Sequence, residues 1–285
     1  MNVRPLGASG FQIAFLIFAV VFLAAPAQKY LGPYLAPDGE MTKSLGRIFV
    51  FVPAVAFLWL IPRVRAFCRR ELAFPISQRD RMEVSIVVAS QALFPFAIFG
   101  AVVLWHWTVG GEMALARRLG QQDTAAAEFA RALSADELAR LVLAAVVAPI
   151  IEELVFRGML FRTWEAEWGW FKAMIATSLV FAAYHPVPFS AFVGSVVLIA
   201  LYRRTGSLRA CILAHAVYNG LLWYPLMGRF VFRTVGKETG EIELWPFHLA
   251  MLALLAVALP VYVWMARDRN VDQPSAPEEI CAARS

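Results

Sequence analysis

The sequence predicts an all-α membrane protein, a polytopic bundle of about eight transmembrane helices. Of its 285 residues, 60% are hydrophobic and 16% are charged, against roughly 45–50% and about 25% in soluble domains. Apolar runs long enough to cross a hydrocarbon layer of about 30 Å recur along the chain. The basic residues gather at the ends of these runs, as orientation signals do. The net charge of +5 therefore indicates membrane topology and not binding of nucleic acid.

The first three candidate spans are apolar runs separated by turn and charge signals. They cover residues 10–27, 46–62 and 84–107. The first ends in Ala25-Pro26-Ala27, a small-residue pattern that could be a signal-peptidase site. Only one arginine precedes this run and several spans follow it, which favours an uncleaved first helix.

Five further runs follow a polar loop at about 108–138. They cover 139–161, 171–186, 188–202, 207–228 and 246–266. The loop before the last run contains Gly236-Lys237-Glu238-Thr239-Gly240, and the segment after Ala266 is polar throughout. We expect that polar tail to be disordered, because it has too little apolar surface to bury.

The arginine-rich second loop, from Arg63 to Arg81, decides the predicted orientation. Loops rich in Lys and Arg lie on the cytoplasmic side, and an even number of spans returns both termini to that side. The protein is therefore predicted to be a multi-pass protein of the cell membrane. The chain is rich in Ala and Arg, as proteins encoded by GC-rich bacterial genomes are. This composition favours the cytoplasmic membrane of a bacterium.

Two adjacent carboxylates, Glu152 and Glu153, lie inside the apolar run 139–161. A charge at membrane depth costs roughly 2.5–3.5 kcal/mol on insertion scales, and ionisable residues there usually serve function. Glu153 precedes Arg157 by four residues, the favoured orientation for an ion pair on a helix. Glu152 is rotated by about 100° from Glu153, and we expect it to be available for chemistry.

Two later runs carry further polar side chains at membrane depth. His185 ends the fifth run, and His215 and Asn219 share a helix face in the seventh. Phe181 lies four residues before His185, where its ring can fix the imidazole. Because buried polar groups must find partners, these side chains are expected to converge with Glu152 on one cavity open to the cytoplasm. Taken singly, each histidine could be a packing residue and Asn219 could be a helix-to-helix contact.

This set of groups suits hydrolysis of an amide. A carboxylate can take a proton from the attacking water, and an imidazole N–H with an amide can stabilise the oxyanion. The chain has no Ser nucleophile in a G-x-S-x-G elbow, no H-E-x-x-H motif and no phosphate loop. A zinc site of Glu152, His185 and His215 stays open as an alternative.

Three motifs resemble those of the CAAX prenyl protease 2 and bacteriocin-processing (CPBP, abortive-infection) family of intramembrane proteases. They are Glu152-Glu153-Leu-Val-Phe-Arg157, Phe181-Ala-Ala-Tyr-His185 and His215-Ala-Val-Tyr-Asn219, which occur in the family's order within 139–228. The resemblance implies that Glu152 and His185 activate water. It implies that His215 and Asn219 stabilise the oxyanion and that Glu153 and Arg157 hold the site. It favours a glutamate-type mechanism without a metal cofactor.

The predicted function is cleavage of a peptide bond in a membrane-associated protein or peptide, with the lipid bilayer as the other partner. Bacteria generally lack protein prenylation, and Cys281 near the C-terminus is followed by four residues where a prenylation box has three. A proton-coupled transporter is an alternative, although the chain lacks the internal repeat that transporters often show. A non-catalytic scaffold or immunity protein of the same fold is another.

These expectations divide the chain into four parts. We predict N-terminal helices and a polar loop over 1–138, a catalytic core over 139–228, a last loop and helix over 229–266, and a cytoplasmic tail over 267–285.

Overall fold

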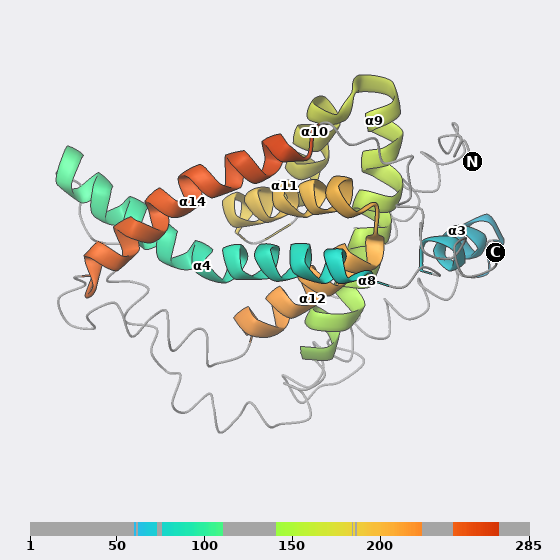
Figure 1. Ribbon diagram of the computed structural model, residues 1–285, viewed down its shortest axis with the longest axis horizontal. Helices are drawn as coiled ribbons and strands as arrows, with labels where there is room; N and C mark the ends of the chain where they lie inside the picture. The colour runs from blue at the N-terminus through green and yellow to red at the C-terminus, as the bar shows by residue number, and fades with distance from the viewer. Residues whose placement is uncertain are drawn as a thin grey trace, which may run out of the picture.

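Every regular element in the part of the chain that the structure describes is a helix (Figure 1). The structure is a computed structural model, and it describes residues 60, 62–72, 76–110, 141–183, 185, 187–223 and 242–267. The all-α prediction is confirmed for these residues. The predicted span 10–27, most of the span 46–62, the polar loop 111–138, the loop 229–240 and the tail after Arg267 lie outside them.

The longest described helix is α4, Gln78–Val109. It begins six residues before the apolar run 84–107, because Ser77 and Asp80 form a reciprocal capping box. The Asp80 N–H donates to the Ser77 hydroxyl at 3.1 Å, and the Ser77 N–H donates to the Asp80 carboxylate at 3.0 Å. Gly110, with a positive φ of 68°, ends the helix.

Helix α14, Trp245–Met265, packs along α4. Their closest approach is at Gly100, where an added Cβ would lie 2.3 Å from the backbone oxygen of His248. The buried His248 side chain donates from Nδ1 to the carbonyl oxygen of Phe96 at 3.1 Å. Among the described helices, α4 and α14 have the length and apolar composition needed to cross a membrane.

A continuous helical run from Leu143 to Trp168 carries the acidic pair, and two stretches of it are π-helical. It comprises η1 (Leu143–Val147), α8 (Ala148–Glu153), η2 (Leu154–Phe161) and α9 (Arg162–Trp168). In Figure 1 this run crosses α4 and α11. Stretches of π-helix are rare and frequently occur at functional sites. Hydropathy alone gave no sign of them.

Three more helices complete the core around this run. They are α10 (Trp170–Ala183), α11 (Pro188–Thr205) and α12 (Leu208–Trp223). Gly206, with a φ of 65°, ends α11 and permits the tight turn into α12. Phe161, Tyr202 and Leu201 are fully buried where these helices meet.

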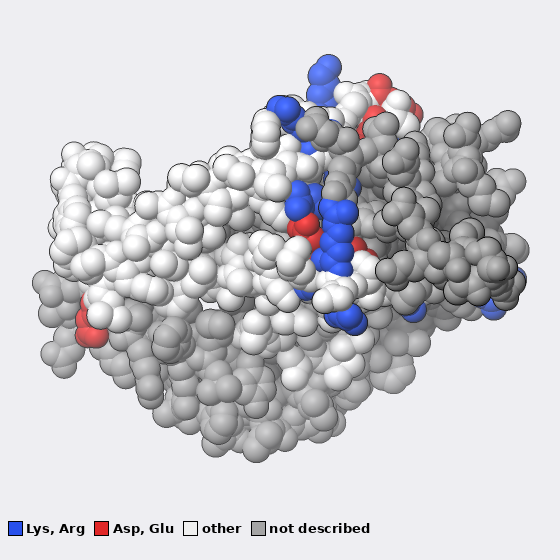
Figure 2. Space-filling model, in the orientation of Figure 1, with Lys and Arg blue, Asp and Glu red and all other residues white. Residues whose placement is uncertain are grey.

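Ion pairs join the helices at one end of the molecule. Arg204, on α11, donates from Nε to Glu83 on α4 at 2.9 Å, and the Tyr262 hydroxyl of α14 donates to the same carboxylate at 3.0 Å. Arg203 pairs with Glu165 and donates from Nε to the carbonyl oxygen of Ala266 at 2.9 Å. Figure 2 shows Lys and Arg atoms, with Asp and Glu atoms among them, near the middle of the view, whereas the white surface to their left is almost uncharged.

Six predicted spans, from 84–107 to 246–266, coincide with α4, the run that contains α8, and α10, α11, α12 and α14. The second loop differs from expectation, because α3 (Pro62–Glu71) forms within it. No glycine or proline interrupts residues 63–71, so helix formation there meets no local obstacle.

Candidate active site

The buried carboxylate of Glu153 is the centre of the polar cluster. Its Oε1 accepts a hydrogen bond from Arg157 Nη1 at 2.9 Å, and both side chains are fully buried. The ion pair expected from the four-residue spacing is therefore present. It holds together the end of α8 and the π-helical stretch η2.

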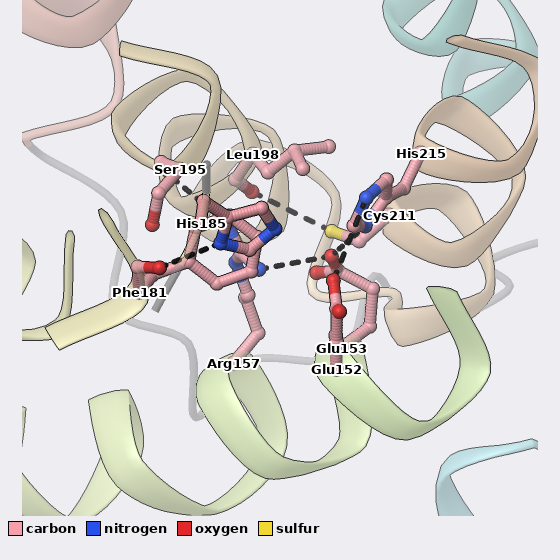
Figure 3. A network of polar contacts seen from close by, with 9 residues as sticks. All are labelled: Glu152, Glu153, Arg157, Phe181, His185, Ser195, Leu198, Cys211 and His215. Atoms are coloured by element: carbon pink, nitrogen blue, oxygen red, sulfur yellow. Dashed lines mark hydrogen bonds and ion pairs between the residues drawn. The ribbon is translucent and has the colours of Figure 1, made fainter. Parts of the chain in front are cut away.

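His215 faces both adjacent carboxylates, which lie together on one side of its ring in Figure 3. Its Nδ1 donates to Glu153 Oε1 at 2.7 Å, while its Nε2 is 3.7 Å from Glu152 Oε2. The sequence pattern predicted Arg157 as the only partner of Glu153. The structure shows His215 as a second partner, because α12 packs against α8. Glu152 is the more accessible carboxylate, with 18% of its side chain exposed.

The Phe181 ring connects the remaining members of the cluster. The guanidinium carbon of Arg157 is 4.8 Å from the ring centroid, and the His185 imidazole stacks on the ring at 4.2 Å. The His215 ring meets it edge-on at 6.2 Å. His185 Nδ1 donates to the Phe181 carbonyl oxygen at 2.7 Å, so the four-residue spacing fixes this imidazole by both stacking and a backbone bond.

Asn219 makes a helix-to-helix contact. Its Nδ2 donates to the carbonyl oxygen of Ala144, in the π-helical stretch η1, at 2.9 Å. This bond is the packing role that the sequence left open for Asn219. The amide carries a second N–H in addition to the one used here.

Two buried residues that the sequence did not single out lie beside the cluster in Figure 3, and one of them contacts it. The carbonyl oxygen of Ser195, on α11, accepts from Arg157 Nη2 at 3.3 Å. Cys211 is fully buried one turn before His215 and donates from Sγ to the Leu198 carbonyl oxygen at 3.5 Å. Both contacts involve backbone acceptors, which no side-chain pattern can reveal.

Within the described ranges, no group of three or more His, Cys, Asp or Glu side chains is arranged to hold a metal ion. His185 turns its Nδ1 to the backbone, and His215 turns its Nδ1 to Glu153.

Comparison with protein families agrees with the motifs. Residues 134–221 match the family model described as type II CAAX prenyl endopeptidase Rce1-like. The chain contains an Rce1-like domain. The matched segment includes Glu152, His185, His215 and Asn219 and confirms the resemblance predicted from the sequence. No curated protein and no solved structure matched the chain.

The Rce1-like domain indicates a protease of the CAAX type, an intramembrane endopeptidase. The apolar surfaces of α4 and α14 agree with a membrane location. Exposed side chains on these two helices include Trp105, Trp107, Val257 and Trp264.

Proposed function

We propose that the chain is a glutamate-type intramembrane endopeptidase in which Glu152 activates the hydrolytic water. The observation that supports this role is the 3.7 Å separation of Glu152 Oε2 from His215 Nε2. The separation is too long for a direct hydrogen bond. A water oxygen at about 2.8 Å from both atoms would fit between them, beside the more accessible of the two carboxylates.

In the proposed reaction, the water oxygen attacks the peptide carbonyl carbon while Glu152 takes one of its protons. The bond from carbon to nitrogen then breaks, and the proton held by Glu152 passes to the leaving amine. His185 directs Nδ1–H to the Phe181 carbonyl oxygen, so its Nε2 is the nitrogen that would accept a hydrogen bond from the same water.

The proposed oxyanion donors are His215 and Asn219. The second N–H of the Asn219 amide is one donor, and Nε2 of His215 is the other when the ring carries both protons. Glu153 and Arg157 keep the His215 ring in place. No metal or other cofactor is needed for these steps.

We also propose the predicted eight-span topology with both termini in the cytoplasm of a bacterial cell. The contacts of Arg203 and Arg204 bring the start of α4, the end of α11 and the end of α14 to one side. This is the grouping that the positive-inside rule requires for the second loop and the tail. The proposed catalytic core remains 139–228.

The proposed substrate is a membrane-associated protein or peptide. To identify it, new chain termini in membrane proteins would be mapped by mass spectrometry in cells that express the wild-type chain or Glu152→Gln. A farnesylated peptide ending in a CAAX sequence serves as a defined probe for the purified protein. We expect Glu152→Gln to abolish cleavage while protein abundance in the membrane stays at the wild-type level. Retained cleavage would refute the assignment of Glu152.

A non-catalytic scaffold is the second candidate, because Asn219 and Arg157 both serve helix packing. A scaffold would keep its cellular phenotype after Glu152→Gln, since that carboxylate is less buried than Glu153, Arg157 and His215. A protease would lose it.

A further inference from the structure

A small pocket with both polar and apolar lining residues lies on one face of α11; its apolar side chains are Phe94, Val193, Val197 and Leu259. Its walls come from α4, α11, α12 and α14, and its polar members are Ser90, Gln91, Ser190 and Tyr218. The pocket is partly open, and its volume for a water-sized sphere is about 10 Å³. Such a space holds about one water molecule, provided that it offers two to four polar partners.

Gln91 is the group that requires a partner there. Its side chain is 5% exposed, and Oε1 meets no hydrogen-bond donor among the described residues. An amide oxygen buried without a donor is destabilising. The Ser90 hydroxyl already donates to the Val87 carbonyl oxygen at 2.8 Å, and Ser190 and Tyr218 supply the other two hydroxyls of the pocket. Each of these hydroxyls still has an oxygen lone pair with which to accept a bond from water.

Two helices, α11 and α12, carry both residues that line the pocket and residues that belong to or contact the candidate active site. Gly194 lines the pocket, and the next residue, Ser195, gives its carbonyl oxygen to Arg157 at 3.3 Å. Tyr218 lines the pocket, and the next residue is Asn219.

Other buried polar atoms, around Arg157, also lack a hydrogen-bond partner. In the described part of the chain, the Ser195 hydroxyl, Glu153 Oε2 and Arg157 Nε are also buried without a hydrogen-bond partner. The polar atoms from Gln91 to Glu153 therefore call for small hydrogen-bonding molecules beyond the protein's own groups.

We propose that the Gln91 pocket is a binding site for ordered water and that it supplies water to the Glu152–His215 pair from within the helix bundle. The claim that the pocket binds water stands on Gln91 and the pocket lining. The claim that this water reaches Glu152 and His215 rests on the proposed peptidase function. A water retained in the pocket would serve hydrolysis directly once it reached that pair.

The binding part is tested on the full chain in detergent by X-ray radiolysis in ¹⁸O-enriched water, which oxidises side chains that touch ordered water. Oxidation is measured by mass spectrometry at Phe94 and Tyr218, which line the pocket. Gln91→Met keeps the side-chain length and removes the amide, so oxidation at both rings should fall severalfold. Gln78→Met, at the exposed start of α4, is the matched control and should leave it unchanged.

The unfolding temperature of Gln91→Met is an independent test of whether water fills the pocket. If the pocket were dry, Gln91→Met would remove an unpaired buried oxygen and raise the unfolding temperature. If water fills the pocket, the same change loses hydrogen bonds and lowers it. Either unchanged oxidation or a higher unfolding temperature would overturn the proposal.

Gly194→Ala is a second variant should Gln91→Met fail to fold. An added Cβ would lie 3.8 Å from Gln91 Nε2, an ordinary contact, and would fill part of the pocket. The same fall in oxidation is expected.

The claim that the pocket supplies water to the active site is tested by kinetics. The kcat on the farnesylated probe should fall in both variants while KM is unchanged, and an unaltered kcat would refute this claim. If the wild-type chain cleaves nothing, the peptidase proposal fails while the oxidation result still decides the water site.

Discussion

Replacing Arg157 with alanine should lower the free energy of unfolding by about 3–5 kcal/mol, the loss found when one partner of a buried ion pair is removed. The full range applies because both Arg157 and Glu153 are completely buried, whereas exposed pairs contribute roughly 0–1 kcal/mol. The variant also loses the bond to the Ser195 carbonyl oxygen and the contact with the Phe181 ring. His215 would be the remaining side-chain partner of Glu153.

The assay is equilibrium unfolding in mixed micelles by SDS titration, followed by tryptophan fluorescence. Arg81→Ala, at an exposed position in the first turns of α4, is the control and should change stability by about 0.5 kcal/mol or less. Adding Glu153→Gln to Arg157→Ala should recover part of the loss, because it removes the stranded charge. A loss no larger than that of the control would refute the buried-pair argument.

Three other outcomes are expected. Gly100→Ala should destabilise the packing of α4 on α14 by about 1–3 kcal/mol, since its Cβ would lie 2.3 Å from the His248 oxygen; Gly220→Ala, with its nearest neighbour at 3.8 Å, should change little in the same unfolding assay. Tyr262→Phe should cost about 1.5–3 kcal/mol by removing the donor to Glu83, and an unchanged SDS midpoint would argue against this bond. Cleavage of the probe should survive prolonged chelation, and the purified protein should hold no stoichiometric zinc by elemental analysis; loss of activity restored by added zinc would replace the glutamate mechanism with a metal one.

The helices were predictable where hydrophobicity changes sharply along the chain. The run 84–107 lies within α4, and the run 188–202 lies within α11. Their ends were harder to place, because capping depends on single polar residues. Ser77 and Asp80 begin α4 within a charged segment that a hydropathy profile assigns to a loop.

Local contacts of the site were predictable, and contacts between helices were not. Glu153 with Arg157, and Phe181 with His185, are four residues apart, and helix geometry alone brings each pair together. The bond of Glu153 to His215 spans 62 residues and depends on how α12 packs against α8. The sequence identified the members of the cluster but not which carboxylate the imidazole would contact most closely.

The bond between Asn219 and Ala144 has a consequence for how variants of this site are interpreted. The acceptor, Ala144, lies in the π-helical stretch η1, five residues before Pro149 and eight before Glu152. If η1 relaxed to an α-helix when this bond was lost, the helix register would slip by one residue. Each residue of slip turns the following side chains by about 100° about the helix axis, which would swing Glu152 away from His215. The bond from Asn219 thus helps to fix the helix register. A loss of activity in Asn219→Ala could therefore come from a misplaced Glu152 side chain as well as from the loss of an oxyanion donor.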